Sequence, residues 1–266
     1  MSSAERGRRA QFRRLRESSV LDVVVNGTWG VREEDVQEIG RRWARTLTAL
    51  KEVDGATFGD WHDAGRGDAS DAVVLPSGDA VSEEVLADYI ERKNEGPDLD
   101  VVGYTTSLWA HNPGKLRVTT AIHAGGSSPY VTNSISLAFR SRELDESTEV
   151  IRRAPEILRI IAEAWDLDAG QVYNDSQYDA VAEQFELQNS HPRCGRAVYL
   201  SAGRAAPAPE SLDGTYIRTA AGGLVIDLTR GGTTVPDNET IIEANRELRA
   251  AGSLTPLPVP IDRDKF

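Results

Sequence analysis

The spacing of apolar and polar side chains predicts a chain of mixed strands and helices. The β-branched run at residues 20–25 predicts a strand, and Asn26-Gly27 predicts a turn that closes it. Steps of three and four residues separate the next apolar side chains and predict a helix of about 20 residues. The side chains on this helical stripe are Val36, Ile39, Trp43, Leu47 and Leu50. Glu33, Glu34 and Asp35 are expected in the first turn of this helix.

The middle of the chain predicts a sheet. Segments 103–110, 115–123 and 133–139 read as three strands joined by Gly- and Pro-containing turns, which is typical of an antiparallel meander. In the third segment Ile135, Leu137 and Phe139 alternate with Ser134, Ser136 and Ala138. This period of two predicts one buried face and one less apolar face.

The C-terminal half predicts three more helices and three short strands. Pro155 suits the first turn of one helix, Asp175 or Ser176 caps the next, and Asp237 caps the last. Strands are expected near Val172 and at residues 197–201 and 224–228. We therefore predict an α+β fold, with a mixed or antiparallel sheet, a central meander at 103–139 and several amphipathic helices. The expected organisation is a basic extension at 1–17, a single domain at 18–257 and a tail at 258–266.

Composition and charge restrict the class of partner. The chain has a net charge of −12, which argues against nucleic acid as a partner because phosphate binding depends on Lys and Arg. It has one cysteine, Cys194, and hence no intramolecular disulfide. Its apolar runs are shorter than the roughly 18 residues of a membrane span, so no membrane partner is expected. These features predict a cytoplasmic protein.

Acidic residues are concentrated in two segments. Residues 54–100 hold thirteen acids and three Lys or Arg, and residues 163–186 hold seven acids and no base. Two solvated surfaces are one interpretation, and an acidic face that meets a basic protein is the other. On the second interpretation the candidate partner-binding residues are Asp166, Asp168, Asp175 and Asp179, with Asp60 and Asp63 as a rival set.

The sequence contains no phosphate-binding loop, nucleophile elbow, HExxH helix or CxxC pair, so we expect neither an enzyme nor a metal or cofactor. The alternative hypothesis is a small-molecule-binding or hydrolytic domain with a pocket near His123, Gly125, Gly126 and Asn133. Trp29 and Trp61 fall at strand ends or turns, where a tryptophan serves either as core or as a contact anchor for a partner.

Several short segments, taken in order, resemble the immunity protein 52 family of bacterial polymorphic toxin systems. They are 23–30 (VVVNGTWG), 58–61 (FGDW), 103–110 (GYTTSLWA), 122–126 (IHAGG), 133–135 (NSI) and 162–166 (AEAWD). The resemblance runs from about Val20 to Leu257-Pro258 and rests on order and spacing. It implies a non-enzymatic α+β protein that neutralises a cognate toxin, commonly one of a restriction-endonuclease-like fold. It supplies no catalytic residues.

Overall fold

A computed structural model describes residues 21–64, 72–76, 80–111, 116–145, 148–188 and 190–266. The predicted extension at 1–17 lies outside these residues. The strands are β1 (Leu21–Trp29), β2 (Trp61–Asp63), β3 (Val73–Leu75), β4 (Tyr104–His111), β5 (Arg117–Ala124), β6 (Asn133–Ser141), β7 (Ala169–Asn174), β8 (Ala197–Leu200), β9 (Thr215–Arg218) and β10 (Leu224–Asp227). The helices are α2 (Val36–Val53), α3 (Glu83–Lys93), α4 (Leu99–Val102), α5 (Glu149–Arg152), α6 (Ala154–Trp165), α7 (Asp175–Gln184), α8 (Ala202–Ala205) and α9 (Asn238–Ala250).

The strands form one ten-stranded sheet in the order β3-β2-β4-β5-β6-β1-β7-β8-β10-β9. Every neighbouring pair is antiparallel, and β4, β5 and β6 are the predicted meander. The α+β prediction is therefore confirmed. The first described strand, β1, lies inside the sheet between β6 and β7, so its backbone is hydrogen-bonded on both edges.

The predicted turn at Asn26-Gly27 is wrong, because β1 continues through both residues to Trp29. Gly27 pairs with Ile135 on one side and with Gly170 on the other. A Cβ atom at Gly27 would lie only 2.1 Å from Cδ1 of Leu167. The glycine is thus required by a close side-chain approach within a strand rather than by a turn.

Helix starts were predicted with mixed success. Asp237 caps α9 as predicted, and Ser82 caps α3; each accepts a hydrogen bond from a backbone N–H in the first turn. The cap of α7 is Asn174, in a reciprocal capping box with Gln177, rather than Asp175 or Ser176. Asp35 is the cap of α2, so Glu33 and Glu34 precede the helix instead of occupying its first turn. The short strand β9 was not predicted, because its burial pattern is mostly exposed.

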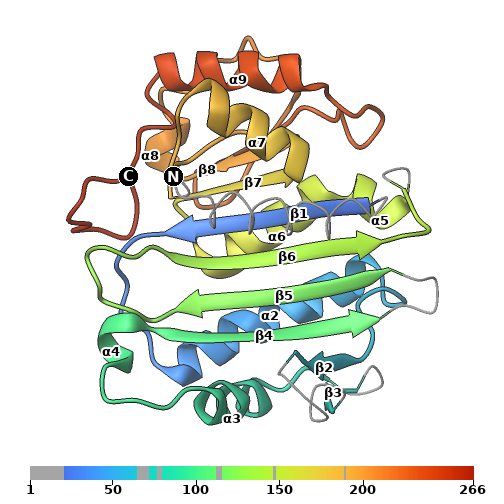
Figure 1. The fold of residues 1–266 in the computed structure, drawn as a ribbon, viewed down its shortest axis with the longest axis vertical. Coiled ribbons are helices and arrows are strands. Elements are labelled where there is room, and N and C mark those ends of the chain that lie inside the picture. The colour runs from blue at the N-terminus through green and yellow to red at the C-terminus, as the bar shows by residue number, and fades with distance from the viewer. Residues whose placement is uncertain (1–20, 65–71, 77–79, 112–115, 146–147, 189) are drawn as a thin grey trace, which may run out of the picture.

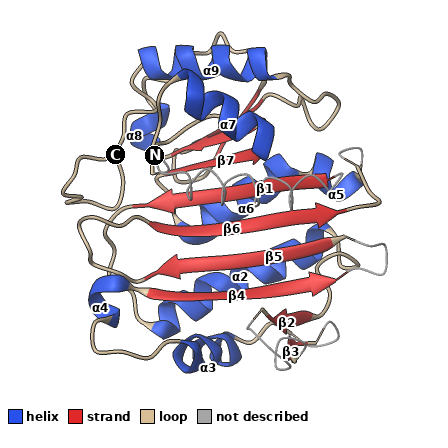
Figure 2. Cartoon of the chain, viewed as in Figure 1, coloured by secondary structure: helices blue, strands red, loops and turns tan. Residues whose placement is uncertain are grey.

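Helices cover the two faces of the sheet unequally (Figures 1 and 2). The larger core lies between one face and helices α2, α3 and α6, and it includes Trp43, Leu137 and Trp165. A second core lies on the opposite face of β8 and β10, under α7 and α9, and includes Val198 and Ile241. The part of the sheet formed by β8 and β10 is therefore covered on both faces.

Among the described residues, no helix covers the second face of β4, β5, β6 and β1, and Figure 1 is viewed onto this face. We call it the open face. Its side chains alternate with core side chains and are half-buried or exposed. They are Asp22, Val24, Asn26, Thr28, Thr105, Ser107, Trp109, Arg117, Thr119, Ala121, His123, Ser134, Ser136, Ala138 and Arg140. Ser134, Ser136 and Ala138 thus lie on the less apolar face, as the period of two in β6 predicts.

The substitution Gly27→Ala tests the close packing in the middle of β1. The added methyl group forces Leu167, which is fully buried, to move, and we expect unfolding to become easier by about 1–3 kcal/mol. Equilibrium urea unfolding measures this. Gly55→Ala is the control, because a Cβ atom there meets its nearest neighbour at an ordinary 3.4 Å. Equal stability of the two variants would contradict the account.

Candidate functional site

The acidic candidates after α6 form ion pairs with residues distant in sequence. Asp168 is buried and receives hydrogen bonds at 2.8 and 2.7 Å from Arg204, whose side chain is fully buried. The backbone N–H of Phe266 donates to the same carboxylate at 2.8 Å. Asp166 is partly exposed and pairs with Lys265 at 2.6 Å. The absence of bases between 163 and 186 is therefore compensated in the fold, and Asp168 does not reach the surface.

The rival set divides in the same way. Asp63 is buried and accepts a hydrogen bond from the Tyr89 hydroxyl at 2.8 Å, while Lys93 lies 2.5 Å from its second oxygen. Asp63 therefore links β2 to α3 and stabilises the fold rather than facing a partner. Asp60 is exposed.

The remaining acidic candidates lie on α7. Asp175 is half-buried at the first residue of the helix, and Asp179 is exposed one turn later. Glu183 follows on the same helix and is exposed as well. Of the acidic candidates at 166–179, the accessible ones thus lie mainly on α7, and Glu183 adds a further exposed acid.

Trp29 and Trp61 both belong to the core, with 0% and 2% of their surface exposed. Trp29 packs against Trp165 at a ring distance of 5.4 Å, and Trp61 stacks on Phe58 at 6.3 Å. Neither ring is available as a surface anchor. The core interpretation of these two residues fits the structure.

The residues of the alternative pocket hold the backbone together. The His123 ring nitrogen Nε2 lies 2.6 Å from the carbonyl oxygen of Val102. The amide of buried Asn133 donates to the Gly30 carbonyl at 2.6 Å and accepts from the Gly126 N–H at 3.3 Å. A Cβ at Gly125 would lie 2.5 Å from the carbonyl oxygen of Glu34, so this glycine permits a close crossing of two chain segments. These contacts give no support to a ligand pocket.

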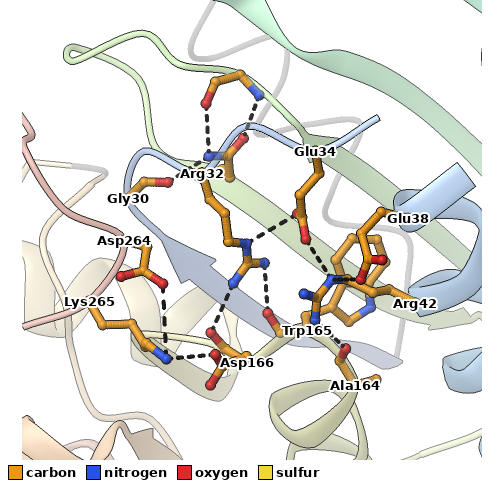
Figure 3. Close-up of polar contacts among 12 residues, drawn as sticks. Gly30, Arg32, Glu34, Glu38, Arg42, Ala164, Trp165, Asp166, Asp264 and Lys265 are labelled. Atoms are coloured by element: carbon orange, nitrogen blue, oxygen red, sulfur yellow. Dashed lines mark hydrogen bonds and ion pairs between the residues drawn. The ribbon is translucent and has the colours of Figure 1, made fainter. Parts of the chain in front are cut away.

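A cluster of two arginines and two glutamates lies beside the C-terminal end of α6 (Figure 3). Arg32 donates to the carbonyl oxygens of Trp165 at 2.8 Å and Asp166 at 3.3 Å, and Arg42 donates to that of Ala164 at 3.0 Å. These carbonyls are at the end of a helix, where they lack intrahelical donors and where positive charge is favourable. The two arginines therefore complete the end of α6.

Glu34 connects the two arginines of this cluster. Its side chain is 5% exposed and lies 3.1 Å from Arg32 Nε and 2.6 Å from Arg42 Nε. Glu38 adds a second ion pair to Arg42 at 3.1 Å. Burial lowers the pKa of Arg32, and Glu34 opposes this effect. The cluster joins the entry to α2 with the end of α6, and its long sequence separations explain why the sequence did not reveal it.

Other sources of chemistry are few. The described residues contain no group of three or more His, Cys, Asp and Glu side chains able to hold a metal ion. Burial raises the pKa of the Cys194 thiol to about 12, so it is neutral and shielded rather than nucleophilic. Within the described parts of the chain, every helix is too short or too polar to cross a membrane.

The sequence did not single out a stack of side chains at one end of the open face. Trp109 of β4 stacks on His62 of β2 at 4.6 Å, and the Arg117 guanidinium of β5 lies 5.0 Å from the Trp109 ring. The sequence pattern could have indicated the position of Trp109. It lies between the core residues Leu108 and Ala110 in a strand and so must point to the less apolar face.

The ion pair between Asp168 and Arg204 should matter far more for stability than the pair between Asp166 and Lys265. Asp168→Asn leaves a buried guanidinium without its counter-charge and should cost about 3–5 kcal/mol in urea unfolding. Asp166→Asn removes a partly exposed pair and should cost about 0–1 kcal/mol. If both variants unfold at the same urea concentration, the structural role assigned to Asp168 is wrong.

The chain is similar to one protein family and, in its fold, to a solved structure. The model of a family described as immunity protein 52 matches residues 24–257. Among solved structures, the Pseudomonas aeruginosa T6SS protein PA0821 has a TM-score of 0.48 and 11% identity, over 90% of this chain and 74% of that chain. No curated protein matches the chain. Because the family model spans most of the sequence and both cores, the protein belongs to the immunity protein 52 family.

Proposed function

We propose that the protein neutralises a cognate bacterial toxin by binding it directly and stoichiometrically. The observation that carries the proposal is the family match over residues 24–257. This range includes β2 to β10 and every described helix, so the match extends over the whole packed structure rather than one motif. An immunity protein needs a toxin as its partner, and we infer that the two meet in the cytoplasm.

We infer that inhibition involves no catalysis by this chain. His123 and Asn133 bind backbone groups, and Cys194 is buried with a raised pKa. A catalytic site needs a nucleophile or base within reach of a substrate, and these side chains are engaged elsewhere or shielded. Simple occupation of the toxin surface is sufficient for an immunity function.

The charge of the chain supports a toxin with a basic surface, as a nuclease of restriction-endonuclease-like fold would have. A nuclease attracts phosphate with a positive cleft, and a protein of net charge −12 is attracted by the same field. The exposed acids of α7, Asp179 and Glu183, are the best-placed candidates for steering this encounter.

Co-expression tests the proposal. The toxin domain encoded beside the gene should stop growth when expressed alone, and this chain should restore growth. The purified proteins should form a complex whose mass by light scattering equals a fixed stoichiometric sum. Failure of the chain to bind or to protect would overturn the proposed function.

Charge reversal on α7 should slow the association of this complex. We expect Asp179→Lys combined with Glu183→Lys to reduce the association rate about tenfold at low salt and to change the dissociation rate less. The difference should shrink as salt rises, because exposed charges are screened beyond about 8–10 Å. Stopped-flow fluorescence measures both rates.

The control for this pair is Asp60→Lys combined with Asp88→Lys. Both positions are exposed, in the other acidic segment of the chain. An equal effect of the two double variants would show a response to net charge alone. No effect of either would contradict acidic steering.

A further inference from the structure

We propose that the toxin docks an α-helix on the open face, along strands β5, β6 and β1, with a carboxylate of that helix on Arg117. This inference rests on the proposed function and identifies the surface and the chemistry of the partner. It differs from the acidic surface of α7, which borders the open face and acts in encounter.

One row of paired residues runs over six strands, and its four middle members lie on the open face. Each member is the register partner of the next across β2, β4, β5, β6, β1 and β7. The row consists of His62, Trp109, Thr119, Ala138, Val24 and Tyr173. Rings occupy both ends, whereas the three central positions carry small side chains.

The ring systems at the two ends are held in place. At one end His62 stacks on Trp109, whose indole N–H donates to the Asp63 carbonyl at 3.1 Å. At the other end Tyr173 contacts Tyr178 of α7 at 4.8 Å, and Arg193 lies 4.0 Å from the Tyr178 ring. Rigid Trp, Tyr and Arg side chains are the types that dominate binding energy in protein interfaces.

Between these ends lies a patch of small side chains, which we call the bed. It consists of Val24, Asn26, Thr119, Ala121, Ser136 and Ala138. All six are half-buried, and the side chains of Asn26, Thr119 and Ser136 form no hydrogen bond with another described residue. A partner can therefore approach the strands closely and still find hydrogen-bonding groups.

The dimensions suit a helix. Trp109 on β4 and Tyr173 on β7 are separated by four strand spacings, or about 19 Å. An α-helix with its side chains is about 10–12 Å across, which leaves room for a ring system on either side. Strands of eight or nine residues are about 26–30 Å long, enough for a helix of roughly 18 residues.

The positive charge of Arg117 indicates what kind of partner binds on the open face. Arg117 is exposed and stacked on Trp109, and it forms no ion pair with any described residue. Its register partner is Arg140, which already pairs with Asp22 at 3.3 Å, so Arg117 is the cation at this end of the bed that lacks an ion pair among the described residues. A carboxylate from outside would supply the missing counter-charge to a guanidinium that already lies over the indole ring.

The same reasoning disfavours two other occupants. A second copy of the chain also carries a net charge of −12, so the two copies would repel each other overall. Residues 1–17 hold six arginines and two acids, so on average they would add positive charge beside Arg117 and Arg140. A toxin helix with small or uncharged side chains toward the bed can approach the strands closely. One carboxylate on that helix supplies the counter-charge for Arg117.

Calorimetric titration of the full-length chain with the cognate toxin tests the proposal. Ala138→Arg and Ala121→Arg place a long side chain in the bed, and each should weaken binding at least a hundredfold. Arg117→Glu should weaken it at least tenfold without relying on a change in the bed. Ala250→Arg is the matched control, since Ala250 is exposed at the end of α9, and it should bind like the wild type.

The outcomes separate the two proposals. In one outcome the wild type binds the toxin, and all three open-face variants bind it with the same affinity and keep the wild-type melting temperature. This result overturns the docking site, whereas the proposed function stands. Absence of wild-type binding overturns the proposed function itself. If the wild-type chain without toxin has the mass of a dimer in light scattering and the open-face variants have the mass of a monomer, the occupant is a second copy. Tighter toxin binding after deletion of residues 1–17 would identify that segment as a competing occupant, and either result overturns this proposal.

Discussion

The packing of helix α6 joins α2 to the middle of the sheet. This helix lies against β1, β7, β8 and β10, and its Trp165 contacts Trp29 of β1 and donates to Thr46 of α2 at 2.9 Å. The turn that follows it brings Asp168 to Arg204. The helix end is completed by arginines from the segment before α2 and from α2 itself, so this contact fixes α6 to the N-terminal part of the chain.

One consequence of this arrangement is the unequal coverage of the sheet. Helices α2, α3 and α6 lie on one face, and α7 and α9 lie on the other side of β8 and β10 only. The described helices therefore leave β4, β5, β6 and β1 with a second face on which polar and small side chains predominate. A sheet face of this kind is stable beside water because antiparallel strands alternate apolar and polar positions. Its strands are hydrogen-bonded to neighbours on both edges, and a preorganised surface of this kind favours association at low entropic cost.

The sequence predicted those parts of the fold that depend on local patterns. Period-two alternation in β6 gave both the core residue Leu137 and the open-face residue Ala138, and the apolar stripe containing Trp43 gave α2. It failed where distant residues decide. Next to Asn26, Gly27 indicated a turn, but in the structure the Leu167 side chain packs against it. Asp168 was counted as uncompensated charge, but in the structure it is paired with Arg204. Counts of charge along the chain cannot include bases supplied from elsewhere in the fold.

The central claim about the partner is that the toxin binds on the open face of the sheet. Photo-crosslinking tests it most directly, with a photoreactive amino acid introduced in place of Ala138 in one variant and of Ala250 in another. The account predicts a covalent adduct with the cognate toxin from position 138 and none from position 250. An adduct from position 250 alone, in a complex that still forms, would contradict it.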